Sequence, residues 1–166
     1  IDAHFQAFKD LGIKVQTTNN HVHLDSTNAK SGPVWLTETS PTATENIIML
    51  AVTLPGRTTI VHAACEPNVQ QLCSFLASCG AEISGIGSSV LTISGGRPLT
   101  PVEVTVMPDI YEIGTFLALG AVTGGRVSIK NSLPQYFTAI NREFARFGIN
   151  ITYSDDTAIV EAGQKP

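Results

Sequence analysis

Residues 39–52 combine a helix start with an apolar run, and they read Thr39-Ser40-Pro41-Thr42-Ala43-Thr44-Glu45-Asn46-Ile47-Ile48-Met49-Leu50-Ala51-Val52. Pro41 ends the preceding strand, and Thr42 followed by Glu45 is the pattern of a capping box. These signals predict a helix over residues 41–53, and the run from Ile47 to Val52 is apolar on every face of it. Because such a helix must be enclosed on every side, we expect it to lie inside the fold.

The same pattern returns further along the chain. Asp109-Ile110-Tyr111-Glu112 is an acidic helix start, and the apolar run Thr115–Ala121 follows it. Gly12, Gly80 and Gly148 recur at an interval of 68 residues in matching apolar contexts. A fixed period of this length indicates a repeat architecture. We therefore predict βαβαββ units, with a half unit at residues 1–30 and full units at residues 31–97 and 98–166.

Hydrophobic periodicity gives the expected elements of these units. Helices are expected at residues 2–11, 41–53, 67–79, 109–121 and 134–147. Strands are expected at residues 13–16, 22–24, 34–36, 57–61, 82–83, 90–93, 102–106, 126–129, 149–153 and 158–160. The helix at 134–147 has one polar face, whereas those at 41–53 and 109–121 have none. The predicted fold class is α/β (α+β), with repeated βαβαββ units forming an inside-out α/β prism with buried parallel helices.

Composition excludes several classes of protein. The 166 residues carry a net charge of −4, which argues against a nucleic-acid binder because such a protein needs a basic surface. No apolar run approaches the roughly 20 residues of a membrane span. The chain opens on Ile1 with no signal-peptide pattern and no initiator Met, which predicts an internal fragment or a processed chain. Cys65, Cys73 and Cys79 lack CxxC spacing, which predicts reduced thiols in a cytoplasmic protein.

A few local features are candidate sites. Parallel inner helices would present free N–H groups and partial positive charge at one end, which favours phosphate or carboxylate binding, unless these residues only start the helices. Glu66 stands just before a helix and is a poor N-cap, so a ligand role and a capping role both stay open. His21 and His23 have metal-like spacing without a third ligand nearby. We therefore predict no metal site and no cofactor.

Four segments resemble consecutive motifs of the UDP-N-acetylglucosamine enolpyruvyl transferase family. They are Thr39–Ile47, Cys65-Glu66-Pro67, Gly80–Gly87 and Met107–Thr115, and the opening Asp2-Ala3-His4 is also similar to a segment of that family. The resemblance covers nearly the whole chain in order. It implies six units in two domains, with the interdomain boundary near residue 106 of this chain.

By this resemblance, the substrates would be UDP-N-acetylglucosamine and phosphoenolpyruvate, joined in the first committed step of peptidoglycan synthesis. Asp2 and Ala3 would lie along the uridine. The nucleotide diphosphate would be bordered by Glu38, Thr39, Ser40 and Pro41, and His4 and Thr42 would also be substrate-binding residues. Glu66 and Asp109 match acidic positions near the cleft and the hinge.

Two departures from the family pattern bear on the acceptor. Glu38 stands where the family commonly has Lys, and a carboxylate there would repel a diphosphate. Pro41-Thr42 replaces a small pair ending in Gly, which leaves less freedom for close backbone approach. These departures keep open a related transferase whose acceptor is shikimate phosphate or another nucleotide.

The resemblance assigns no catalytic residue to this chain. The family's reactive cysteine would lie before Ile1, and its phosphoenolpyruvate-binding cations and catalytic acid also fall outside these residues. We therefore predict no turnover by the chain alone. A third reading is a non-catalytic module that uses the repeats for assembly, and incomplete units would also allow a homo-oligomer.

Overall fold

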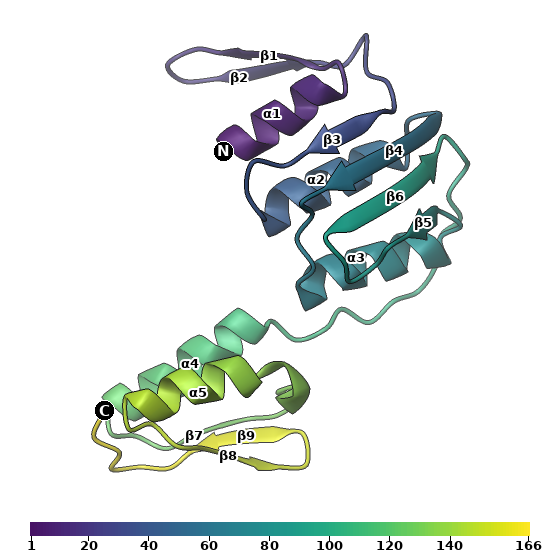
Figure 1. Ribbon diagram of the computed structural model, residues 1–166. Coiled ribbons are helices and arrows are strands. Elements are labelled where there is room, and N and C mark those ends of the chain that lie inside the picture. Colours follow the sequence, from purple (N-terminus) through teal and green to yellow (C-terminus); the bar gives the residue numbers. More distant parts are fainter. The chain divides into compact units, whose positions relative to one another are not determined.

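The computed structural model describes residues 1–166, which divide into two compact units, Ile1–Thr105 and Val106–Pro166. Figure 1 shows that each unit sets helices against a sheet.

Unit 1 contains a hairpin, a four-stranded sheet and three helices. Its helices are α1 (Asp2–Asp10), α2 (Pro41–Ala51) and α3 (Pro67–Ser78). Its strands are β1 (Lys14–Thr17), β2 (Val22–Asp25), β3 (Pro33–Trp35), β4 (Gly56–Val61), β5 (Glu82–Ser84) and β6 (Val90–Gly95). Strands β1 and β2 pair with each other, and the larger sheet has the order β3-β4-β6-β5. Strand β3 is parallel to β4, whereas β4 and β5 are antiparallel to β6.

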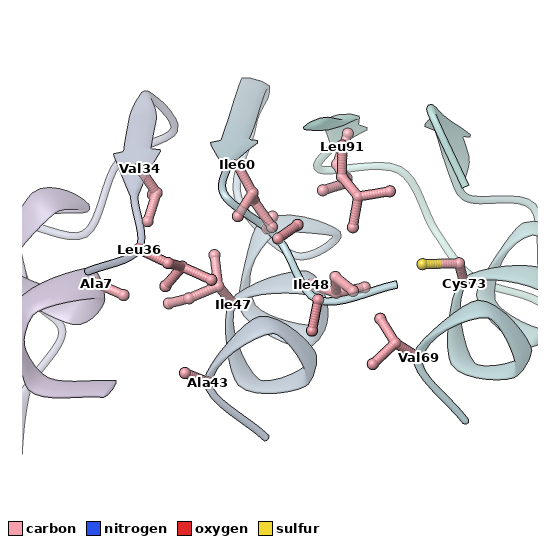
Figure 2. Packing of buried hydrophobic residues seen from close by; sticks show 14 of the residues in the cluster. Ala7, Val34, Leu36, Ala43, Ile47, Ile48, Ile60, Val69, Cys73 and Leu91 are labelled. Carbon is pink, nitrogen blue, oxygen red and sulfur yellow. The ribbon is translucent and has the colours of Figure 1, made fainter. Parts of the chain in front are cut away.

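The core of unit 1 lies between this sheet and its helices. Figure 2 shows Val34, Ile60 and Leu91 of the strands directed toward Ile47 and Ile48 of α2. Both isoleucines are 0% exposed, and full burial of such a side chain is worth about 1.5–3 kcal/mol. Strand β6 passes close to the end of α2 because position 95 is a glycine, where an added Cβ would collide with the carbonyl oxygen of Ala51.

Unit 2 repeats most of this order on a smaller scale. Its elements are α4 (Ile110–Val122), β7 (Val127–Ile129), the 3₁₀ helix η1 (Pro134–Tyr136), α5 (Thr138–Arg146), β8 (Ile151–Ser154) and β9 (Thr157–Val160). The sheet has the order β7-β9-β8, and both pairings are antiparallel. Its core is formed by Ile113, Leu117, Ala121, Phe137, Ile149, Ala158 and Val160.

The repeat predicted from the sequence appears in the sheets of both units. Strands β4, β6 and β5 of unit 1 correspond in order and direction to β7, β9 and β8 of unit 2. Most predicted elements agree with the structure to within two residues at each end.

Two predicted elements are wrong. Residues 102–106 form no strand: they are exposed and pair with no neighbour, and alternation alone does not supply the hydrogen bonds that a strand needs. The predicted helix at 134–147 is divided at Phe137, which ends the 3₁₀ helix η1 and precedes α5. The α-helix begins only at Thr138, and no side chain caps its start.

The apolar helices are also less enclosed than predicted. In α2, Met49 is 46% exposed, and in α4 Phe116 is 52% and Val122 is 65% exposed. Each of these helices buries one face and leaves part of its apolar surface uncovered. No helix in the structure has the length and apolar character required to cross a bilayer.

Candidate functional site

The first turn of α2 is capped by Ser40, which corrects the prediction of a Thr42–Glu45 capping box. The amide of Ala43 donates to Ser40 Oγ across 3.3 Å, and the amide of Thr44 donates to the Ser40 carbonyl oxygen across 3.0 Å. Ser40 lies outside the helix with an extended backbone, as an N-cap should. Pro41 has no N–H to satisfy, so this end needs few partners.

The structure brings the opening segment of the chain against this end of α2. Helices α1 and α2 pack together, and the His4 ring of α1 lies between two side chains of α2. Its Nε2 is 3.2 Å from Thr42 Oγ1, and the Asn46 amide nitrogen is 2.9 Å from its Nδ1. Two segments predicted to border one ligand, Asp2–His4 and Glu38–Thr42, are therefore neighbours.

A small open cavity lies along α1, and none of His4, Thr42 and Asn46 lines it. It has a volume of about 290 Å³ and is lined by Asp2, Phe5, Gln6, Lys9 and Thr37. Its lining includes the carboxyl group of Asp2, the amino group of Lys9, the amide of Gln6 and the aromatic ring of Phe5.

The other predicted positions here differ in what they can offer a ligand. Ala3 is buried in the core, so its side chain is not available to a ligand. Glu38 and Thr39 are exposed next to the helix start, and the Glu38 carbonyl oxygen accepts from the Ser40 amide across 2.9 Å.

Glu66 does not cap α3 with its side chain. It occupies the N-cap position, but it makes no side-chain cap hydrogen bond, and its Oε2 is buried without a donor. Nearby, Asn68 donates from Nδ2 to Glu45 Oε1 across 2.8 Å and leaves its own Oδ1 buried without a donor. Leaving a buried acceptor unsatisfied costs about 1–3 kcal/mol. Neither oxygen is exposed to solvent, so in this arrangement neither is available to a ligand.

Asp109 caps α4, as predicted. Its Oδ1 accepts from the amides of Tyr111 and Glu112 across 2.8 and 3.1 Å. The same residue lines a groove of about 490 Å³ that runs between α4 and β7 in unit 2. Glu112, Phe116 and Lys130 also line this groove.

The remaining sequence candidates do not gather into a site. His21 immediately precedes β2, and His23 lies on that strand. No group of three or more His, Cys, Asp or Glu side chains is arranged to hold a metal ion. All three cysteines are free: Cys65 is exposed, and Cys73 and Cys79 are buried. Burial raises the pKa of the Cys73 thiol to about 11, which keeps it protonated and unreactive at neutral pH.

Sequence reasoning missed Asn46 and Asn68. Asn46 follows Thr42 by four residues, a spacing that places both on one face of a helix. That spacing was available from the sequence, whereas the packing of His4 between them depends on how α1 meets α2. Asn68 gave no local signal, because its partner Glu45 lies on a different helix.

Comparison with known proteins extends over the whole chain. Residues 1–166 match the family described as EPSP synthase (3-phosphoshikimate 1-carboxyvinyltransferase). The UDP-N-acetylglucosamine 1-carboxyvinyltransferase of Borreliella burgdorferi is 41% identical over 165 residues, covering 99% of this chain and 39% of that protein. The protein of the same name from Bacteroides fragilis is 38% identical over 164 residues, covering 98% of this chain and 38% of that protein. The chain thus spans well under half the length of these curated relatives.

Solved structures share the fold. The enolpyruvyl transferase NikO from Streptomyces tendae matches with a TM-score of 0.77 at 19% identity, covering 99% of this chain and 43% of that one. EPSP synthase from Acinetobacter baumannii matches with a TM-score of 0.61 at 18% identity, covering 96% of this chain and 38% of that one. These matches confirm the predicted inside-out α/β fold class. Because the family match extends from the first residue to the last and the curated relatives carry the predicted name, the chain belongs to the EPSP synthase family of enolpyruvyl transferases.

Proposed function

We propose that this chain is part of a transferase that moves enolpyruvate from phosphoenolpyruvate to a hydroxyl of UDP-N-acetylglucosamine, in peptidoglycan synthesis in the cytoplasm. Relatives with that acceptor in their name are 33–41% identical to it. The observation that carries the proposal is the contact of His4 with Thr42, since it joins the two segments expected to border the nucleotide.

In this proposal, unit 1 supplies half of a substrate site. Asp2 and the cavity beside it take the uridine, and the diphosphate lies along residues 38–42 at the start of α2. Glu66, at the start of α3, contacts the acceptor in this proposal. Asp109 belongs to unit 2, and the division of the chain after Thr105 supports an interdomain boundary near residue 106. None of these residues is assigned a catalytic role, so we expect binding without turnover.

A second acceptor class is supported by Glu38. This exposed carboxylate lies two residues before the N-cap of α2, where a diphosphate would meet like charge. A transferase acting on shikimate phosphate or on a nucleotide with one phosphate would suffer less repulsion. The open strand edges of incomplete units support a further proposal, that copies of the chain associate.

A calorimetric titration of the 166-residue chain tests these proposals. The ligands are UDP-N-acetylglucosamine, UMP and shikimate 3-phosphate, and the matched variant is Glu38→Lys. Selective binding of UDP-N-acetylglucosamine, strengthened by Glu38→Lys, is the result we expect. Preference for UMP or shikimate 3-phosphate would favour the second acceptor class. Absence of binding to all three would count against a ligand site in this chain and favour a non-catalytic assembly module.

A further inference from the structure

A short relay of side chains connects α1 to the start of α2. His4 lies between Asn46 and Thr42, with contacts of 2.9 Å at Nδ1 and 3.2 Å at Nε2. Thr42 and Asn46 are one helical turn apart, so they present side chains on the same face of α2. His4 and Asn46 are only partly exposed, whereas Thr42 is exposed at the surface.

The Asn46 amide group indicates which atom donates in each of these two hydrogen bonds. Its amide nitrogen faces His4 Nδ1 and can only donate, so Nδ1 must carry a lone pair. A neutral ring with a bare Nδ1 carries its proton on Nε2. His4 Nε2–H therefore donates to Thr42 Oγ1, and the Thr42 hydroxyl keeps its own proton for another acceptor.

No acceptor within the chain takes that proton. Other threonines near helix starts and ends donate back to the main chain: Thr44 donates to the Ser40 carbonyl oxygen, and Thr115 donates to that of Tyr111. Thr42 makes no such bond, and its amide N–H also has no partner in the chain. The next two amides, those of Ala43 and Thr44, already donate to oxygen atoms of Ser40. The free donors at this end of α2 are therefore concentrated on Thr42.

We propose that His4 and Asn46 are positioning residues that hold the Thr42 hydroxyl as a donor to a phosphate oxygen of the bound nucleotide. This inference rests on the proposed nucleotide site at residues 38–42. If the ring carried its proton on Nδ1 instead, Nε2 would accept a hydrogen bond from the Thr42 hydroxyl. That hydroxyl proton would then not be available to the ligand. With its amide nitrogen on Nδ1, Asn46 disfavours this arrangement, so a residue one turn further along α2 acts on the contact between Thr42 and the ligand.

The tautomer of His4 is the first test. Nitrogen-15 NMR of the histidine rings in the 166-residue chain near neutral pH distinguishes a protonated from a bare ring nitrogen. The His4 signal is assigned as the one lost in His4→Gln. We expect Nδ1 to be bare and Nε2 to be protonated in the wild-type chain, and Asn46→Leu to give a mixture of tautomers. A wild-type ring protonated on Nδ1 alone would overturn the inference.

Binding of UDP and of uridine is the second test. Thr42→Val and His4→Leu each remove one link, and we expect each to weaken UDP binding about tenfold, the effect of losing one hydrogen bond to a charged group. Uridine binding should be unchanged, because uridine has no phosphate. Thr42→Ser and His4→Gln restore a hydroxyl or an amide donor and should recover most of the UDP affinity. Thr53→Val, at the other end of α2, is the control.

The outcomes separate this inference from the proposed function. If the wild-type chain binds UDP and both Thr42→Val and His4→Leu bind it equally well, the relay is wrong and the nucleotide site stands. Equal losses for UDP and uridine would mean that the variants damage the fold, and the positioning role would be rejected. If the wild-type chain binds neither ligand, the nucleotide site itself fails and the inference fails with it.

Discussion

The hydroxyl of Thr44 accepts the amide N–H of Ala64 across 3.0 Å, which joins the first turn of α2 to the loop before α3. The same hydroxyl donates to the Ser40 carbonyl oxygen across 2.8 Å, so both of its roles are used. Thr44 is 0% exposed and Ala64 is 2% exposed. Two segments that carry proposed site residues are therefore held together by one buried side chain.

Replacing Thr44 with Val should destabilise unit 1. The change keeps the shape but leaves the buried amide of Ala64 without an acceptor, which costs about 1–3 kcal/mol. Urea unfolding followed by circular dichroism measures the difference in the free energy of unfolding. Thr44→Ser retains the hydroxyl and should cost clearly less, and equal losses in the two variants would argue against the hydrogen bond as the cause.

Substitutions of Asp109 can separate the contribution of helix capping to stability from the contribution of its negative charge. Asp109→Ala removes the acceptor for two amides of α4 and should lower stability by about 1 kcal/mol. Asp109→Asn keeps a capping oxygen and removes the negative charge, so it should fold almost as well as the wild type. Thermal unfolding of the three proteins checks this. If Asp109→Asn were as unstable as Asp109→Ala, charge rather than capping would be the main contribution.

Cys73 should make stability depend on pH in the alkaline range. Burial raises its pKa from 9.0 to about 11, so the folded protein holds this proton more tightly than the unfolded chain does. The stabilisation is fully present below pH 9.0 and is lost as the pH rises through about 11. The loss should be on the order of 2 kcal/mol, since one pKa unit corresponds to about 1.4 kcal/mol.

Cys73→Ala is the matched variant for this pH dependence. Its free energy of unfolding, measured in urea at several pH values, should fall less steeply than that of the wild type above pH 9.0. Other groups titrate in both proteins, so only the difference between the two profiles reports on the thiol. Parallel profiles would show that Cys73 does not contribute.

The two units have separate cores, and this division can be tested with two truncations. Phe137→Ala removes the largest fully buried side chain of unit 2 and should cost about 3–5 kcal/mol there. Ile48→Ala acts on the core of unit 1 and should cost about 2–5 kcal/mol. Amide hydrogen exchange should show loss of protection confined to the unit that carries each change. Loss of protection across all 166 residues from either change would show a single cooperative unit.

The sequence predicted the helices and most strands because their signals are local. Pro41, Pro67 and Asp109 mark helix starts, and the glycines at the 68-residue interval mark the ends of corresponding helices. The repeat also predicted that residues 98–166 form helices and strands in the same sequence as residues 31–97. These features depend on neighbours within a few residues or on the period of the repeat.

What the sequence did not predict depends on partners that are distant along the chain. Residues 102–106 alternate like a strand, but no other strand pairs with them, so they form no strand in the structure. Ser40 rather than Thr42 caps α2, because the helix begins at Pro41 and Thr42 therefore lies inside its first turn. The acceptors on Glu66 and Asn68 become buried only when the chain folds. The roles of the proposed site residues stay predictions until ligands are titrated.

The unpaired edge of β7 bears on how the chain behaves at high concentration. Unit 1 covers the corresponding edge of β4 with the parallel strand β3, whereas β7 has only β9 as a neighbour. An open edge is a template for intermolecular strand addition and therefore a route to aggregation. The strand is only three residues long and lies between Arg126 and Lys130, and brevity and cations are features that discourage such addition. Flanking charge at β7 therefore opposes intermolecular strand addition, and removing those two cations should raise aggregation at high concentration.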